Sequence, residues 1–180
     1  MLLVNRDNPM PMDYKYNLRS LPNGECVDVT IYDDLMDMIC AAEEDNVYMF
    51  VNWAFRSEKV QQILFDFEVK IRKNCGMSDE DALEETKKYV AYPGVSEHHT
   101  GLAVDLDPVK GKSKAAEIYA WLRENAWKYG FILRYPEDKT EITGFNFEPW
   151  HYRYVGKTAA KVIFERKICL EEYIEMHNNV

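Results

Sequence analysis

Residues 96–107, Ser-Glu-His-His-Thr-Gly-Leu-Ala-Val-Asp-Leu-Asp, join a glycine-bounded loop to a segment of alternating character. The alternation predicts a β-strand whose two faces differ. Leu102 and Val104 take one face, and Ala103 and Asp105 take the other. A carboxylate inside a sheet needs a cation or several hydrogen bonds to offset its loss of water. We therefore expect this strand to lie in the core and to carry a charged site on one face.

Working outward from this strand, the flanking segments carry either helical or extended patterns. Several segments place apolar residues at helical spacing, and short runs rich in β-branched and aromatic residues predict strands. Because helices and strands come in clusters, we expect an α+β fold with a central, mainly antiparallel sheet flanked by helices. The expected helices cover about residues 31–45, 58–75, 78–89 and 113–129, with one or two more near the C-terminus. The expected strands cover 47–51, 102–107, 131–135 and 149–155, with a turn over 136–140.

Length and composition predict one globular domain over residues 1–180. The 180 residues are 47% hydrophobic and 29% charged, which excludes a disordered or fibrous chain. Residues 1–25 hold three of the seven prolines and show little periodicity, so we expect an extended N-terminal arm there. With 22 Lys+Arg against 31 Asp+Glu, the net charge is −9. Such a charge repels phosphate backbones, and we expect no nucleic-acid partner.

The N-terminus and the cysteines bear on where the protein works. The apolar run after Met1 ends at Asn5, far short of a signal sequence or of the ~20 residues that span a bilayer. We expect no membrane segment in this chain. The four cysteines form no Cys-x-x-Cys pair and are expected to be free and mostly buried. These features favour the cytoplasm, and an extracytoplasmic protein whose leader or anchor lies outside this sequence is the alternative.

Three residues on different segments form a candidate metal site. His98 lies in the glycine-bounded loop, Asp105 in the strand that follows, and His151 in a later strand. Two imidazoles and one carboxylate leave a coordination position open, as in catalytic zinc sites. The spacing leaves other interpretations open, in which Asp105 pairs with Arg134 or Arg153 and His151 belongs to an aromatic cluster. We assign no site role to the remaining histidines, His99 and His177.

Two further residues could complete a hydrolytic site. Glu148 lies three residues before His151 and could act as a general base for a water nucleophile. Residues three apart point to opposite faces of a regular strand, so this role requires a bend at Pro149. Arg56 follows a predicted buried strand and is either a structural ion-pair residue or a stabiliser of an oxyanion. Nothing in its neighbourhood decides between the two.

These segments resemble the motifs of the LAS metallopeptidases. Residues 96–105 match the pattern Ser-x-His-x-x-Gly-x-Ala-x-Asp, and residues 148–151 match the Glu-x-x-His zinc motif. Residues 131–144, Phe-Ile-Leu-Arg-Tyr-Pro-Glu-Asp-Lys-Thr-Glu-Ile-Thr-Gly, are similar to a stretch of the VanY group of D-alanyl-D-alanine carboxypeptidases, which includes the VanXY enzymes of vancomycin resistance. The resemblance runs from about residue 27 to residue 173 and implies the LAS fold.

The resemblance also implies roles for individual residues. It assigns Zn²⁺ to His98, Asp105 and His151, the base to Glu148, and stabilisation of the oxyanion to Arg56. Further residues fall at positions that contact or border the substrate. Gln61 and Ser96 match positions that contact the terminal D-alanine, while Trp53 stands where relatives have a small or acidic residue and is expected to narrow the pocket.

The implied reaction is hydrolysis of the D-Ala-D-Ala bond at the end of a peptidoglycan precursor, with D,D-dipeptidase activity as an extension. Enzymatic alternatives on the same fold are an L,D-carboxypeptidase and a peptidoglycan endopeptidase. A non-haem iron oxygenase also uses two histidines and a carboxylate, although its usual close His-x-Asp/Glu spacing is absent here. A peptidoglycan-binding module that has lost catalysis is the non-enzymatic alternative.

Overall fold

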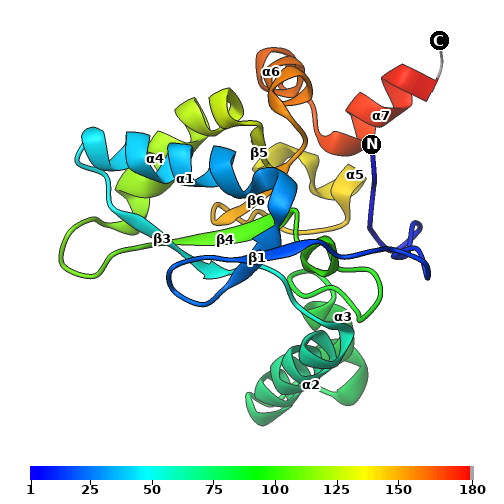
Figure 1. The fold of residues 1–180 in the computed structure, drawn as a ribbon. Coiled ribbons are helices and arrows are strands. Elements are labelled where there is room, and N and C mark those ends of the chain that lie inside the picture. Colours follow the sequence, from blue (N-terminus) through cyan, green and yellow to red (C-terminus); the bar gives the residue numbers. More distant parts are fainter. Residues whose placement is uncertain (179–180) are drawn as a thin grey trace.

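A computed structural model describes residues 1–178, which are built around a four-stranded sheet (Figure 1). The strand order is β3–β4–β6–β5, and each pair of neighbours is antiparallel. The expected α+β class with an antiparallel sheet is therefore confirmed. The strands are β3 (Met49–Trp53), β4 (Ala103–Pro108), β5 (Phe131–Leu133) and β6 (His151–Tyr154).

Helices lie on both sides of this sheet. Figure 1 shows α1 and α4 above the sheet, while α2 and α3 extend below it. Two further helices, α6 and α7, pack against the β5 edge through a small apolar cluster. The helices are α1 (Val29–Glu44), α2 (Glu58–Asn74), α3 (Asp79–Thr86), α4 (Ala115–Asn125), α5 (Thr140–Thr143), α6 (Lys157–Arg166) and α7 (Leu170–Asn178).

The two faces of the sheet differ in chemistry because side chains alternate along each strand. Val104, Leu106 and Tyr152 are fully buried on the face that packs against α1 and α4. The opposite face carries Asp105 of β4 directly across from His151 of β6. One face therefore forms the hydrophobic core, and the other is left to a polar site.

A β-bulge extends the polar row onto β3. The register shifts between Val51 and Trp53, so that Trp53, and not Asn52, lies opposite Asp105. Residues directly opposite each other on neighbouring strands point to the same face, and bulges are common where a side chain is re-aimed beside a site. The bulge therefore places Trp53 beside the charged pair of β4 and β6.

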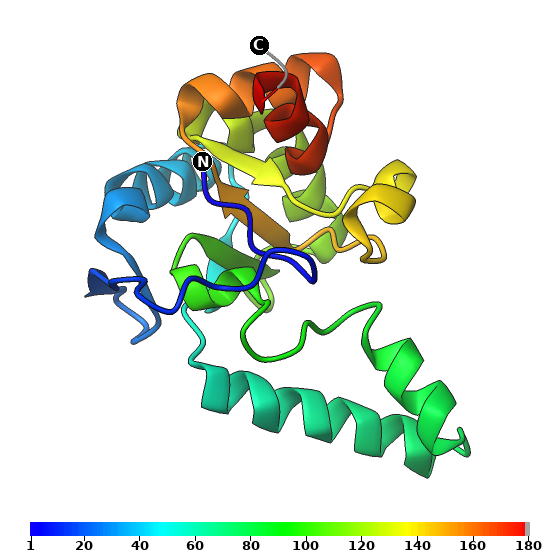
Figure 2. The ribbon, with the colours of Figure 1, turned by 90° about the vertical axis from the view of Figure 1, so that its right-hand side faces the viewer.

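Helices α2 and α3 form a limb that stands away from the sheet, as both views show (Figure 2). Ser57 caps α2 by accepting a hydrogen bond from the backbone of Val60. The buried residues of α2 are Gln61 and Phe65, and the helix packs chiefly on α3. The limb therefore places Gln61 at the polar face of the sheet while most of α2 remains exposed.

Several boundaries differ from those expected. The last strand begins at His151, because the chain turns at Pro149, and the turn over 136–140 contains the 3₁₀ segment η3 (Glu137–Lys139) and the start of α5. The helix expected over 113–129 ends in a separate 3₁₀ segment, η2 (Ala126–Tyr129). A small hairpin and the turn that carries His98 were not predicted from the sequence. These elements are β1 (Leu18–Ser20), β2 (Cys26–Asp28) and η1 (Glu97–Thr100).

The arm over residues 1–25 is irregular apart from β1, and it crosses to other segments. The backbone of Met10 donates a hydrogen bond to the carbonyl of Gly94 at 2.7 Å.

The cysteines are free, as expected, but Cys40 and Cys75 are exposed, so the expectation of mostly buried thiols is wrong. Among residues 1–178, no helix combines the length and the apolar character needed to cross a membrane.

Candidate metal centre and active site

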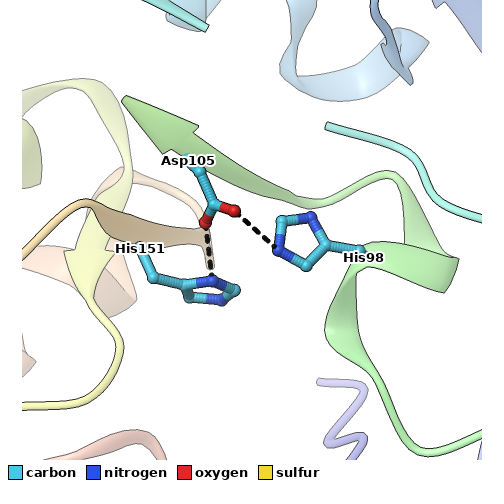
Figure 3. A group of neighbouring side chains, drawn as sticks. All are labelled: His98, Asp105 and His151. Carbon is cyan, nitrogen blue, oxygen red and sulfur yellow. Dashed lines mark hydrogen bonds and ion pairs between the residues drawn. The ribbon is translucent and has the colours of Figure 1, made fainter. Parts of the chain in front are cut away.

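The three candidate metal ligands meet on the polar face of the sheet (Figure 3). Asp105 and His151 are a cross-strand pair of β4 and β6, and His98 projects toward them from η1. Their ligand atoms all lie within 4.8 Å of one another, and all three residues are buried. The structure thus brings together the residues that the sequence analysis grouped.

A glycine fixes the turn that presents His98. Gly101 ends η1 in the left-handed conformation at φ 72°, and a Cβ atom there would lie 2.8 Å from the backbone nitrogen of Asp28. Any other residue would meet both backbone strain and this clash. Thr100 completes the turn by accepting a hydrogen bond from the backbone of Leu102 at 2.9 Å. Local geometry therefore holds His98 directly before β4.

The protonation of His98 suits a metal ligand. Its Nδ1 lies 2.7 Å from the carbonyl oxygen of Ala54, which can only accept, so Nδ1 carries the proton. The lone pair of Nε2 then faces Asp105 Oδ2 at 3.4 Å. Burial, together with the nearby Arg56 cation, lowers the pKa of His98 to about 4 and keeps the ring neutral. A neutral imidazole oriented by a backbone carbonyl is the usual arrangement of a metal-binding histidine.

Asp105 is the centre of the cluster. Its Oδ1 lies 2.9 Å from His151 Nδ1, and its Oδ2 lies 3.2 Å from Arg56 Nη2. Burial acts to raise the pKa of Asp105, but His98 and His151 outweigh it and hold the pKa well below its usual range. The alternative pairing with Arg134 or Arg153 is wrong, because both of these arginines pair with Glu97 instead.

The donor set fits a divalent transition metal. The nitrogens that face Asp105 are His98 Nε2 and His151 Nδ1, so with a carboxylate oxygen they offer a two-nitrogen, one-oxygen set. Three protein ligands of this kind leave a coordination position for a further ligand. Zinc binds such atoms at roughly 2.0–2.2 Å. The ligand atoms come from β4, β6 and the turn η1, and the sheet register sets Asp105 directly opposite His151. The residues present therefore match the zinc ion that the sequence motifs imply.

Glu148 enters the same site from the turn before β6. The bend expected at Pro149 is present, and the backbone of His151 donates to the Glu148 carbonyl at 3.2 Å. This turn places Glu148 Oε2 3.8 Å from His151 Nδ1. Burial raises the pKa of the Glu148 carboxyl to about 7. A buried carboxyl with such a pKa can both accept and return a proton near neutral pH.

Arg56 is buried beside the cluster with part of its guanidinium unused. Nη2 contacts Asp105, and Nη1 donates to Gln61 Oε1 at 3.0 Å. Nε has no hydrogen-bond partner among residues 1–178. The ring of Trp53 lies 5.1 Å from the Arg56 guanidinium carbon. Arg56 is therefore held in place and retains an unpaired donor.

Gln61 uses both ends of its amide within the protein. Its oxygen accepts from Arg56, and its nitrogen donates to the carbonyl of Ala91 at 2.7 Å. The side chain thereby links α2 to the loop before η1 and fixes the Arg56 fork. The geometry gives Gln61 a role in holding Arg56.

A cavity of about 350 Å³ joins all of these residues. The cavity extends from the sheet to the limb formed by α2 and α3, so a ligand within it would contact both the sheet and the limb. Every residue selected from the sequence lines it: Trp53, Arg56, Gln61, Ser96, His98, Asp105, Glu148 and His151.

Two supporting residues in η1 were not predicted from the sequence. His99 Nδ1 lies 2.6 Å from the carbonyl of Arg56, and its Nε2 accepts from the backbone of Gly94 at 3.0 Å. His99 therefore anchors the backbone that carries Arg56. Glu97 is buried behind His151, with Oε2 3.8 Å from His151 Nε2. His177 is exposed and bonds within its own helix, which agrees with the absence of a site role.

The chain is similar in sequence to a known family over most of its length. The VanY model, described as D-alanyl-D-alanine carboxypeptidase, matches residues 24–157. The chain belongs to the VanY family. A D-alanyl-D-alanine carboxypeptidase of Enterococcus faecalis is 47% identical to this VanY-family chain over 174 residues, covering 97% of the chain and 65% of the relative. The chain thus spans just under two thirds of that relative's length.

Solved structures of VanY proteins share the fold over nearly the whole chain. A glutamate-to-alanine variant of the D,D-pentapeptidase VanY from a VanB-type resistance cassette, in complex with Zn(II), matches with a TM-score of 0.95 at 46% identity, covering 96% of this chain and 97% of that one. VanYB in complex with D-alanine-D-alanine matches equally well, with coverage of 97% and 96%. An L,D-carboxypeptidase, LdcB, matches with a TM-score of 0.78 at 35% identity, covering 96% and 84%.

Proposed function

We propose that this chain is a zinc metallopeptidase that hydrolyses the D-Ala-D-Ala bond at the end of peptidoglycan precursors. The observation that carries the proposal is the convergence of three groups on one cavity. These are the metal-ligand cluster, the buried Glu148 carboxyl and the unpaired Arg56 donor. Membership of the VanY family and the likeness to a structure with bound D-alanine-D-alanine support the choice of substrate.

His98, Asp105 and His151 would hold the metal ion in this proposal. When bound, zinc supplies Lewis acidity, which polarises the substrate carbonyl and makes water nucleophilic near neutral pH. The role of the three side chains is to fix the position of that ion against the polar face of the sheet.

Glu148 would move the protons of the reaction. Its carboxylate accepts a proton from the attacking water and then donates it to the nitrogen of the departing D-alanine. The buried position, and the pKa raised to about 7 that results from it, suit both steps. Arg56 would donate to the oxyanion that forms on the scissile carbonyl, because it is already oriented by Asp105 and Gln61.

The remaining lining residues would recognise the end of the peptide. Ser96 lines the same cavity as the ligand cluster and would contact the terminal D-alanine. Gln61, predicted for the same contact, would act through Arg56 as well, since its amide already bonds there. Trp53 lies at the mouth with 38% of its surface exposed and would limit what precedes the scissile bond.

An L,D-carboxypeptidase is the second candidate, because LdcB shares the fold at 35% identity. The two activities differ in the residue that precedes the cleaved D-alanine. Release of D-alanine should therefore be measured from a muramyl pentapeptide, a muramyl tetrapeptide and free D-Ala-D-Ala, each with zinc-loaded, iron-loaded and metal-stripped protein. We expect zinc-dependent release from the pentapeptide, and activity on the free dipeptide would add a D,D-dipeptidase function.

Other outcomes of this experiment identify the alternatives. Release from the tetrapeptide but not from the pentapeptide would replace the proposal with L,D specificity, and cleavage inside the stem would indicate an endopeptidase. Turnover that requires Fe(II) and O₂ would indicate an oxygenase, and binding without release would indicate a recognition module. The expected cytoplasmic location and the absence of a nucleic-acid partner stay predictions, which cell fractionation and a nucleic-acid binding assay would test.

A further inference from the structure

Glu97 is a fully buried carboxylate whose two oxygens have different environments. Its Oε1 accepts hydrogen bonds from Arg134 Nε and from Arg153 Nη1, each at 2.8 Å. Its Oε2 has no hydrogen-bond partner among residues 1–178. A carboxylate that served only to neutralise two arginines could use both oxygens to do so. We therefore expect Oε2 to have another partner.

The nearest polar atom that also lacks a partner belongs to His151. Its Nε2 is buried, has no hydrogen bond within the described chain, and lies 3.8 Å from Glu97 Oε2. Buried polar atoms in proteins are nearly always paired, and two unpaired atoms that face each other indicate one shared interaction. A small movement of the imidazole would bring the pair to hydrogen-bonding distance.

The contact between His151 and Glu97 has a function if the cluster binds zinc as in the proposed function, because the metal then determines which ring nitrogen of His151 carries the proton. His151 Nδ1 is the ring atom that faces Asp105, at 2.9 Å, and it belongs to the ligand cluster. A metal ligand must offer a lone pair, so the single proton of a neutral imidazole then resides on Nε2. That proton points toward Glu97 Oε2.

We propose that Glu97 is a positioning residue that holds the proton of His151 on Nε2 and thereby presents Nδ1 to the metal ion. Carboxylates that accept from the second nitrogen of a ligating histidine orient the ring and strengthen the ligand. Glu97 is the residue between Ser96 and His98 in the Ser-x-His motif, and it faces the ring nitrogen of His151 that does not face Asp105.

Two arginines fix Glu97 for this task. Arg134 continues from Glu97 to Glu171 of α7, donating through Nη1 at 2.9 Å and through Nη2 at 2.6 Å. Arg153 donates through Nη2 to the carbonyl of Leu2 at 2.7 Å. Both cations lie on the Oε1 side, so they hold Glu97 ionised and leave Oε2 for His151.

The test compares Glu97→Gln with the matched control Glu171→Gln. Both variants remove one negative charge beside Arg134, but only Glu97 faces His151. In Glu97→Gln, the amide oxygen can still accept from the arginines, whereas the amide nitrogen would meet the Nε2 proton with a second donor. We expect zinc affinity, measured by competition with a chromophoric chelator, to fall about 10- to 100-fold in Glu97→Gln and less than about threefold in Glu171→Gln.

The second readout needs no variant. The ¹⁵N shifts of the His151 ring in zinc-loaded wild-type protein should show the proton on Nε2. Equal zinc affinities in the two folded variants, or a proton on Nδ1 of the zinc-loaded wild type, would overturn the proposal. Neither readout uses a peptide substrate, so failure here is distinct from failure to release D-alanine.

Discussion

Two buried arginines on the same side of the sheet show how this fold separates support from chemistry. Every nitrogen of the Arg134 guanidinium donates to a carboxylate, with contacts of 2.6 to 2.9 Å to Glu97 and Glu171. Arg56 makes one longer carboxylate contact, 3.2 Å to Asp105, and its Nε has no partner in the described part of the chain. A saturated cation stabilises the fold, whereas a cation with a free donor is prepared for a ligand.

The same division extends to the groups around each arginine. We call the group around Arg56 the metal-side cluster and the group around Arg134 the support cluster. The metal-side cluster lines the cavity, and the support cluster lies behind His151 and ties β6 to η1 and α7. Changes in the first should alter turnover, and changes at the arginines and Glu171 of the second should mainly alter stability, whereas Glu97 also acts on the metal site through His151. The metal-side cluster consists of Arg56, His98, Asp105 and Glu148, and the support cluster consists of Glu97, Arg134, Arg153 and Glu171.

The largest expected effect follows from Glu148→Gln on the metal side. We expect D-alanine release from the pentapeptide to fall by up to about 10⁴-fold, because the amide cannot accept the proton of the attacking water. Zinc affinity should stay close to that of the wild type, since Glu148 is not among the ligand atoms. Single-turnover release of D-alanine and competition with a chelator for zinc, on one preparation, measure the two quantities. Turnover of this variant at the wild-type rate would refute the role of Glu148 as the base.

On the support side, Arg153→Met should mainly destabilise the fold. It leaves Glu97 with one cation fewer in a fully buried position, and breaking a buried ion pair costs about 3–5 kcal/mol of unfolding free energy. Lys161→Met, which removes an exposed pair with Glu165, is the control, with an expected loss below about 0.5 kcal/mol. Urea unfolding measures both variants. Equal losses would mean that the support cluster is not a structural unit.

Arg56→Lys should affect turnover more than stability. A lysine can reach Asp105 but loses the free Nε donor and the planar fork, so we expect kcat to fall about 10²- to 10³-fold. Arg134→Lys is the matched change on the support side and should lower unfolding free energy with a smaller effect on kcat. If both substitutions changed the same quantity, the distinction between the two arginines would be wrong.

The sequence could predict the metal-side cluster because its ligands and Glu148 fall in two recognisable motifs, residues 96–105 and 148–151. Asp105 is a carboxylate inside an apolar strand, and the pairing of β4 with β6 brings it to His151. The bend that brings Glu148 into the site was also readable from Pro149. Most helices and strands followed from periodicity, with errors concentrated at their ends.

The support cluster could not be predicted in the same way, because the two motifs assign no role to its residues. Glu97 meets partners 37 and 56 residues away, and no local pattern shows that it is buried. A signal was present, since Arg134 and Arg153 follow apolar strand residues and each needed an acidic partner. The hairpin β1–β2 was missed because its strands have three residues each and β1 is exposed.

The smallest expected effect concerns Trp53 at the rim. Trp53→Ala should widen the mouth and change the ratio of kcat/KM for pentapeptide over free dipeptide by less than about tenfold, since the indole is partly exposed. Steady-state kinetics on the two substrates give this ratio. An unchanged ratio would show that Trp53 does not select the substrate.

The central claim is that the metal-side cluster is a zinc site, and the stoichiometry of bound zinc tests it most directly. Native mass spectrometry of wild-type protein and of His98→Ala, each dialysed against one equivalent of zinc, supplies the measurement. We expect one zinc ion per wild-type chain and loss of that ion in His98→Ala. A wild-type chain that binds no zinc, or a variant that retains it fully, would contradict the account.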